Sequence, residues 1–268
     1  MITDIVDTTL RDGEQKAGIA LGVDDKVKIA QFINEMGVYQ MEVGIPAMGG
    51  DEKISIKKIV DLGLDSKISA WNRMNIKDID SSIECGVDII HISTPASDLQ
   101  IKSKLGKDRT WVIQNLKKSI DYTKNKGYEV TVGLEDSSRS DINFLIELCR
   151  IVFQMGVERI RYADTVGIAE PRILFNQIKK IREKVPVEIE IHTHNDFGMA
   201  IANSLLAVDA GAKFVDCTIA GVGERAGNCN FSDFIKVMYE LKGKKLWLKS
   251  FEDVIEKERQ IKKIVGFQ

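Results

Sequence analysis

The stretch IEIHTHNDFG, from Ile189 to Gly198, begins as a β-strand and ends with two histidines. Successive side chains of a strand point to opposite faces, so His192 and His194, two residues apart, face the same way. Asn195 and Asp196 follow at once, and the chain has only three histidines in all. This pattern predicts metal ligands at the end of a strand. The alternative is two polar residues that close the strand in a turn.

The same unit, a short strand followed by a helix, recurs along the whole chain. Segments of helical length and period lie between the strands, and several end on a glycine suited to a helix C-cap, such as Gly37 and Gly127. The eight expected strands are Ile5–Leu10, Tyr39–Pro46, Lys67–Arg73, Val87–Pro95, Glu129–Asp136, Arg159–Val166, Val187–Asn195 and Ala212–Ala220. Eight such pairs predict an α/β protein whose parallel sheet closes into a (β/α)8 TIM barrel. An open, doubly wound sheet is the alternative.

We expect the barrel to occupy residues 1–245 and a C-terminal helical extension to occupy residues 246–268. Phe251, Val254, Ile261 and Val265 form one apolar stripe in that extension. The helix either caps the barrel or docks another chain, and the sequence favours neither role.

Composition excludes several classes of protein. The 268 residues carry a formal net charge of -2 and are 44% hydrophobic, which argues against nucleic-acid binding or attachment to a membrane surface. The four cysteines form no Cys-x-x-Cys pair, so neither a disulfide framework nor a zinc finger is indicated. The N-terminus lacks the features of a signal peptide, and no apolar run is long enough to span a membrane. We therefore expect a soluble, cytoplasmic protein with reduced thiols.

Charged and metal-binding residue types gather at the carboxyl ends of the expected strands, whereas the strand interiors are expected to be apolar. Active sites of barrel enzymes lie at these ends. Closure of the barrel places strand 1 near strands 7 and 8, so Asp12, His192, His194 and Asn228 can converge. One carboxylate, two imidazoles and an amide oxygen leave open positions on an octahedral divalent ion. This set predicts Mg, Mn, Fe or Zn acting as a Lewis acid.

Such an ion can chelate a 2-oxo acid through its carboxylate and its keto oxygen. Arg11, next to Asp12, supplies a fixed positive charge for the oxyanion that develops. Two alternatives remain open: Asp12 is a turn residue at the end of a strand, and Arg11 forms an ion pair with Asp12 or Glu14.

The loop GVGERAGN, Gly221 to Asn228, is similar to a dinucleotide-binding fingerprint. The fingerprint also needs a following βαβ unit, which the remaining chain does not provide, so a nicotinamide cofactor is not expected. The glycines instead let the backbone approach a ligand closely. Arg139, Lys102, Lys104 and Lys107 either meet the phosphates of a carrier such as coenzyme A or are solvated surface charges.

Three motifs carry a resemblance to a known family: DTTLRDGEQ at Asp7–Gln15, HTHNDFGMAIAN at His192–Asn203, and GVGERAGN at Gly221–Asn228. They resemble the pyruvate-carboxyltransferase-like family of metal-dependent TIM barrels, which includes isopropylmalate, citramalate and homocitrate synthases and hydroxymethylglutaryl-CoA lyase. The likeness covers nearly the whole chain and is strongest to the homocitrate synthases of nitrogen fixation. The lyases place a catalytic cysteine in the loop after strand 8, where this chain has Gly-Glu-Arg, which favours a synthase.

The resemblance implies that Asp12, His192 and His194 bind a divalent metal (Mg, Mn or Zn), with Asn228 at or near the ion. The reaction that it implies is a Claisen condensation of acetyl-CoA, the co-substrate, with 2-oxoglutarate, followed by thioester hydrolysis to homocitrate and CoA.

The resemblance also implies roles around the metal. Arg11 steadies the keto oxygen and Gln15 lines the pocket. Thr165 holds the keto-acid carboxylate, and Arg73, by its position, binds the distal carboxylate of 2-oxoglutarate. Glu135 assists proton transfer.

One feature departs from the family pattern. The synthases continue past the barrel into subdomains that complete a partner protomer's site, and no HEAGIH-like motif is present in this sequence. We therefore expect the barrel subunit of a split, oligomeric synthase whose remainder is a second chain. The alternatives are an isopropylmalate or citramalate synthase, an aldolase or lyase of the same family, or a subunit that binds metal and ligand without full activity.

Overall fold

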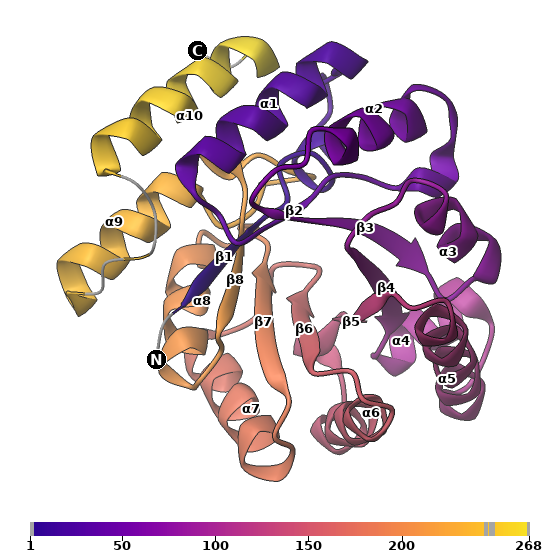
Figure 1. Ribbon diagram of the computed structural model, residues 1–268. Coiled ribbons are helices and arrows are strands. Elements are labelled where there is room, and N and C mark those ends of the chain that lie inside the picture. The colour runs from indigo at the N-terminus through magenta and orange to yellow at the C-terminus, as the bar shows by residue number, and fades with distance from the viewer. Residues whose placement is uncertain (1–2, 244–245, 247–249, 267–268) are drawn as a thin grey trace.

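Eight parallel strands, each hydrogen-bonded to the next in sequence order, close into a barrel in which β8 pairs with β1 (Figure 1). The computed structural model describes residues 3–243, 246 and 250–266. The strands are β1 (Asp4–Asp7), β2 (Gln40–Glu42), β3 (Lys67–Arg73), β4 (Ile89–Pro95), β5 (Glu129–Glu135), β6 (Arg159–Asp164), β7 (Glu188–Thr193) and β8 (Phe214–Cys217). This closed order confirms the predicted (β/α)8 barrel and excludes the open sheet.

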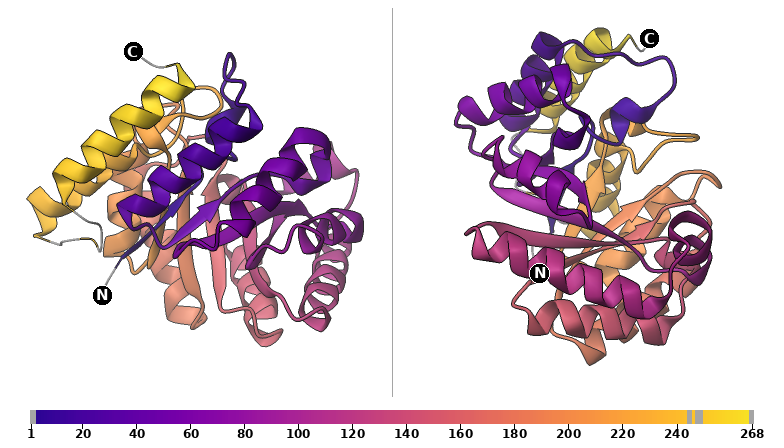
Figure 2. Two further views of the ribbon diagram at one scale, coloured as in Figure 1. Left: turned by 45° about the horizontal axis from the view of Figure 1, so that its top comes forward. Right: turned by 90° about the vertical axis from the view of Figure 1, so that its right-hand side faces the viewer.

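Helices surround the strands on the outside of the barrel (Figures 1 and 2). The helices of the described residues are α1 (Val23–Met36), α2 (Gly50–Asp61), α3 (Ile76–Ile83), α4 (Asp98–Leu105), α5 (Arg109–Asn125), α6 (Ile142–Gln154), α7 (Pro171–Lys184), α8 (Ala200–Asp209), α9 (Phe231–Lys242) and α10 (Phe251–Val265). Two helices, α4 and α5, fill the β4–β5 crossover, where the sequence pattern predicts one. Gly37 ends α1 in the left-handed conformation, with φ 82°, as expected of a C-cap glycine.

Several strands are shorter than predicted, because the chain leaves the sheet before the end of the strand-like sequence pattern. Strand β1 ends at Asp7 instead of Leu10, and β2 ends at Glu42 instead of Pro46. The residues beyond each strand end form loops and short 3-10 turns, such as Gly13–Gln15. These loops gather at the carboxyl face of the barrel, where they can surround a ligand.

Polar side chains line the inside of the barrel, which shows that the expectation of apolar strand interiors was wrong. On β7, Ile189 and Ile191 belong to the hydrophobic core under the helices. The residues that alternate with them, Glu190 and His192, therefore face the lumen. Arg161 of β6 lies in register with Glu190 and is 1% exposed. The lumen of this barrel thus holds charged groups where many barrels hold branched apolar side chains.

Two arginines of β6 reach across the lumen to β2, on the opposite side of the barrel. Arg161 donates to Glu42 Oε2 at 2.8 Å. One layer lower, Arg159 donates to Gln40 Oε1 at 2.5 Å and stacks 4.4 Å from the ring centroid of Phe214. These contacts tie opposite walls together, so the polar layers act as the packed interior of the barrel.

Helix α10 packs beside α1 on the outer surface (Figure 2, left). Val254 and Ile261 are fully buried in this contact, and Lys257 forms an ion pair with Glu35. The division between residues 1–245 and 246–268 stays a prediction, and part of that boundary falls outside the described residues. No helix in the described part of the chain is long and apolar enough to cross a membrane.

If α10 is an integral part of the barrel, truncating its buried face will destabilise the whole domain. We expect Ile261→Ala to lower the free energy of unfolding by about 2–5 kcal/mol, because it removes a fully buried side chain. Urea unfolding measures this loss, with the exposed Arg259→Ala on the same helix as the control, expected within ~0.5 kcal/mol of wild type. Equal, small losses in both variants would show that α10 docks without contributing to the fold.

Candidate metal centre and active site

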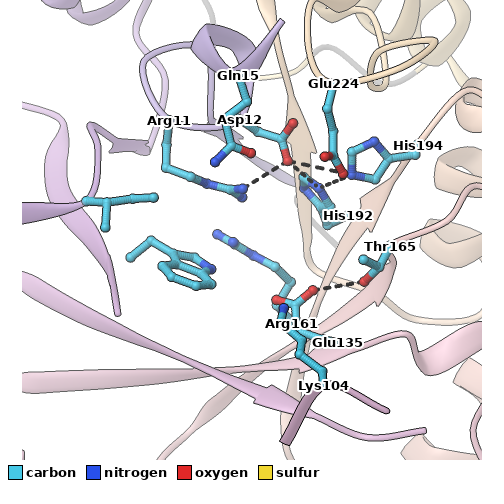
Figure 3. Close-up of a pocket in the computed structure, with 12 residues that line it drawn as sticks. Arg11, Asp12, Gln15, Lys104, Glu135, Arg161, Thr165, His192, His194 and Glu224 are labelled. Carbon is cyan, nitrogen blue, oxygen red and sulfur yellow. Dashed lines mark hydrogen bonds and ion pairs between the residues drawn. The ribbon is translucent and has the colours of Figure 1, made fainter. Parts of the chain in front are cut away.

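Asp12, His192 and His194 converge at the carboxyl face of the barrel (Figure 3). The Nε2 atoms of the two histidines lie 3.2 Å apart. Asp12 Oδ2 lies 3.2 Å from His192 Nε2 and 3.6 Å from His194 Nε2. Adjacent ligands of an octahedral ion with metal–ligand distances of roughly 2.1 Å are separated by about 3 Å. The three ligand atoms are therefore spaced as a divalent cation requires.

Asn228 lies directly beside this cluster. Its Nδ2 donates to Asp12 Oδ1 at 3.0 Å, and its Oδ1 is buried with no hydrogen-bond partner among the described residues. A buried acceptor without a donor is costly unless a cation or a water molecule satisfies it. Gly223 makes this packing possible, because a Cβ there would lie 2.0 Å from Asn228 Nδ2. The donor set, two imidazoles, a carboxylate and an adjacent amide oxygen, fits a divalent metal.

The electrostatics of the metal-free site also indicate a cation. Burial alone would lower the pKa of His192, but hydrogen bonds to Asp12 and Asp216 raise it to about 9. Burial and the neighbouring His192 lower the pKa of His194 to about 4. Burial would raise the pKa of Asp12, yet Arg11 and His192 hold it well below its ordinary value. The site therefore keeps a proton on His192 at the place where a metal ion would bind.

A pocket of about 210 Å³ opens next to the cluster. Its lining includes the predicted residues Arg11, Asp12, Gln15, Glu135, Thr165, His192 and His194, together with Ile45, Trp71, Lys104, Arg161 and Glu224. Arg11 donates through Nε to Glu42 Oε1 at 2.5 Å and through Nη1 to Asp12 Oδ2 at 2.9 Å. Its guanidinium is thus fixed at the edge of the metal cluster, and the ion pair foreseen as an alternative coexists with this position.

Glu135 and Thr165 lie across the pocket from Arg11 (Figure 3). Glu135 accepts from Ser93 Oγ at 2.9 Å through Oε1 and from Thr165 Oγ1 at 2.8 Å through Oε2. Thr165 Oγ1 also accepts from the backbone N–H of Asp136 at 2.8 Å. The carboxylate is therefore held by two hydroxyls at the pocket wall, and Thr165 must redirect its hydroxyl to donate to a ligand.

Arg73 is not brought into the pocket. Its side chain is 66% exposed and binds Asp78 at the start of α3, at 2.6 and 2.9 Å. Trp71, two residues earlier on β3, lines the pocket instead. Lys104 of α4 also lines it and has no hydrogen-bond or ion-pair partner in the described ranges.

Several site residues have no counterpart among the predicted ones. Asp216 of β8 lies 3.0 Å from His192 Nδ1, and Arg161 lies 2.9 Å from Asp216. Burial raises the pKa of Asp216, and Arg161 opposes that rise. The available signal was the alternation of charged and apolar residues in RIRYAD, Arg159 to Asp164. It indicates that one face of β6 is charged, but not which carboxylates it meets.

A closed parallel barrel with an Asp-His-His cluster spaced for a metal ion at its carboxyl face is typical of the class of metal-dependent barrel enzymes. The profile of the HMGL-like family matches residues 3–263. The chain belongs to the HMGL-like family, which confirms the predicted family.

The chain is 70% identical to the homocitrate synthase subunit alpha of Clostridium pasteurianum, over 98% of this chain and 97% of that one. It is 50% identical to 2-isopropylmalate synthase 2 of Caldanaerobacter subterraneus subsp. tengcongensis and 43% identical to homocitrate synthase 1 of Nostoc sp.. The chain spans only 61% and 63% of the lengths of those two relatives.

The HMG-CoA lyase of Bacillus subtilis has the same fold. It superimposes with a TM-score of 0.87 over 99% of this chain and 94% of the lyase chain, at 21% sequence identity. At that identity the likeness concerns the fold alone.

Metal binding should compete with the proton on His192. Because Asp12 and Asp216 raise the pKa of this histidine to about 9, it is charged at pH 7, and Mn²⁺ must displace that proton. We expect the Kd for Mn²⁺ to rise about tenfold for each unit of pH decrease between pH 8 and pH 6, with about one proton released per ion. Calorimetry in buffers of different ionisation enthalpy measures both. An affinity independent of pH would contradict this protonation state.

Proposed function

We propose that this chain is the barrel subunit of a homocitrate synthase, which condenses acetyl-CoA with 2-oxoglutarate to give homocitrate and CoA. The observation that carries the proposal is the 70% identity to a homocitrate synthase subunit alpha, over nearly the full length of both chains. The Asp-His-His cluster and the pocket beside it, which Arg11 and Lys104 help to line, support the same reaction class. The cytoplasm is the proposed location, in keeping with four free, buried cysteines.

The chemistry would be shared between the metal and this chain's own residues. Asp12, His192 and His194, with Asn228 at or next to the ion, would hold a divalent metal (Mg, Mn or Zn). Bound there, the metal supplies a Lewis acid that polarises the keto group of the 2-oxo acid. The guanidinium of Arg11 adds a fixed positive charge for the developing oxyanion.

The residues across the pocket would orient the substrate and move protons. Gln15 contributes to the wall beside the metal cluster. Thr165 is proposed to hold the keto-acid carboxylate by turning its hydroxyl away from Glu135. Glu135, released from that hydrogen bond, is then proposed to assist proton transfer from the acetyl methyl group.

A second chain is proposed as the partner, because the clostridial relative is named subunit alpha. An isopropylmalate synthase stays the alternative, supported by the 50% identity to such an enzyme. Both reactions use a 2-oxo acid and an acyl-CoA, so the choice between them depends on the shape and charge of the pocket.

Substrate binding tests the proposal without requiring the partner. We expect 2-oxoglutarate to bind the Mn²⁺-loaded chain at least about tenfold more tightly than 2-oxoisovalerate or pyruvate, measured by calorimetry. Metal-dependent CoA release with the second chain present should disappear in Asp12→Ala, which removes a ligand atom. Preference for a monocarboxylic keto acid would reject homocitrate synthesis. Equal turnover with and without a second chain would reject the split enzyme.

Two cations compete for the distal carboxylate of 2-oxoglutarate. Arg73 is the predicted residue but is bound to Asp78, whereas Lys104 lines the pocket without a partner in the described part of the chain. We therefore expect Lys104→Met to weaken 2-oxoglutarate binding about tenfold or more and to leave pyruvate binding unchanged. Arg73→Met is the matched control, expected to have a smaller effect. The reverse order in calorimetric Kd values would restore the role predicted for Arg73.

A further inference from the structure

One buried guanidinium, that of Arg161, contacts three carboxylates from three different strands. It donates to Glu42 of β2 at 2.8 and 3.2 Å and forms an ion pair with Glu190 of β7. Its Nε lies 2.9 Å from Asp216 Oδ2 of β8. All four side chains are about 1% exposed or less. Groups buried in this way stay charged only while they remain paired.

Asp216 connects Arg161 to the candidate metal ligands Asp12, His192 and His194. The same Oδ2 atom that faces Arg161 lies 3.0 Å from His192 Nδ1. A carboxylate on one ring nitrogen of a histidine fixes the ring orientation and presents the other nitrogen to a metal. His192 Nε2 is the atom that points at Asp12 and His194.

Glu42 connects Arg161 to Arg11. Glu42 accepts from Arg161 and, through Oε1, from Arg11 Nε at 2.5 Å. Arg11 also donates Nη1 to Asp12. Its Nη2 has no hydrogen-bond partner within the described ranges, which leaves that nitrogen for a ligand in the pocket.

We propose that Arg161 is a positioning residue for two parts of the site at once: through Asp216 it orients the metal ligand His192, and through Glu42 it orients Arg11. The Arg11 half rests on the proposed function, whereas the metal half does not. Arg161 reaches both carboxylates because a planar guanidinium donates in several fixed directions, which an ammonium group cannot do.

Arg159 provides a matched comparison, because it lies two residues earlier on the same strand and faces the same lumen. It is also buried and pairs with Glu190 and Gln40. Within the described part of the chain, it makes no hydrogen bond or ion pair with Glu42, Asp216, Arg11 or the metal-ligand candidates. If both buried arginines serve only to stabilise the fold, replacing either one should have the same effect on binding. If Arg161 is a positioning residue, only its replacement should weaken binding at the site.

The experiment compares Arg161→Gln, Asp216→Asn, Glu42→Gln and the control Arg159→Gln with the wild type. Electron paramagnetic resonance of free Mn²⁺ gives the metal Kd without any keto acid. Calorimetry at saturating Mn²⁺ gives the 2-oxoglutarate Kd, and thermal melting verifies that each variant is folded.

We expect Asp216→Asn to weaken Mn²⁺ binding about 10- to 100-fold and to leave the 2-oxoglutarate Kd of the loaded protein within about threefold of wild type. Glu42→Gln should weaken 2-oxoglutarate binding and leave the Mn²⁺ Kd within about threefold of wild type. Arg161→Gln should weaken the binding of both Mn²⁺ and 2-oxoglutarate, whereas Arg159→Gln should weaken neither. If Arg161→Gln does not fold, the opposite effects of the two carboxylate variants decide in its place.

Equal losses of Mn²⁺ and 2-oxoglutarate affinity in the Arg159 and Arg161 variants would overturn the inference. Unchanged Mn²⁺ binding in Asp216→Asn, or unchanged 2-oxoglutarate binding in Glu42→Gln, would also overturn it. If the wild type binds Mn²⁺ but does not bind 2-oxoglutarate, the proposed function is rejected. The Mn²⁺ affinities of Asp216→Asn and Arg161→Gln then still decide the inference, because the metal half needs no keto acid.

Discussion

The contact between Arg161 and its three carboxylates in the barrel lumen is the interaction on which the site depends. Bringing these charges out of water costs several kcal/mol per ion, and their mutual pairing offsets that cost only with good geometry. The closed sheet provides the geometry, because it places β2, β6, β7 and β8 around one lumen. Removing one partner of such a set typically destabilises a protein by about 3–5 kcal/mol, so the layer constrains the fold and the chemistry together.

Charge balance explains why a metal would bind at the upper edge of this layer. The lumen and the pocket floor hold the guanidinium groups of Arg11, Arg159 and Arg161 against four carboxylates, those of Asp12, Glu42, Glu190 and Asp216. In the metal-free chain the proton on His192, whose pKa is about 9, offsets part of the negative charge of these carboxylates. A divalent cation in place of that proton would add positive charge beside Arg11, which suits a substrate that carries carboxylates.

The loops after β7 and β8 complete the site through a second set of contacts. Arg225 binds Asp196 at 2.9 and 3.1 Å and donates to the backbone oxygen of Thr165 at 2.8 Å. It adopts a positive φ of 54°, which is uncommon for a residue with a side chain. The hydrogen bond from Asn195 N to Gly227 O joins the same loops. These contacts hold Asn228 beside Asp12 and the two histidines, although more than thirty positions separate it from His194.

The sequence by itself determined the eight-fold alternation of strands and helices, and hence the barrel, because period-two and period-3.6 patterns are local. It also determined that Asp12, His192 and His194 share a face, because barrel closure follows from strand order. Only the tertiary structure decided how buried charges pair, since Arg161 meets Glu42 over 119 positions of sequence. It also decided that Arg73 turns to Asp78 while Lys104 faces the pocket. Long side chains choose among several partners, and that choice depends on three-dimensional distances that no local pattern encodes.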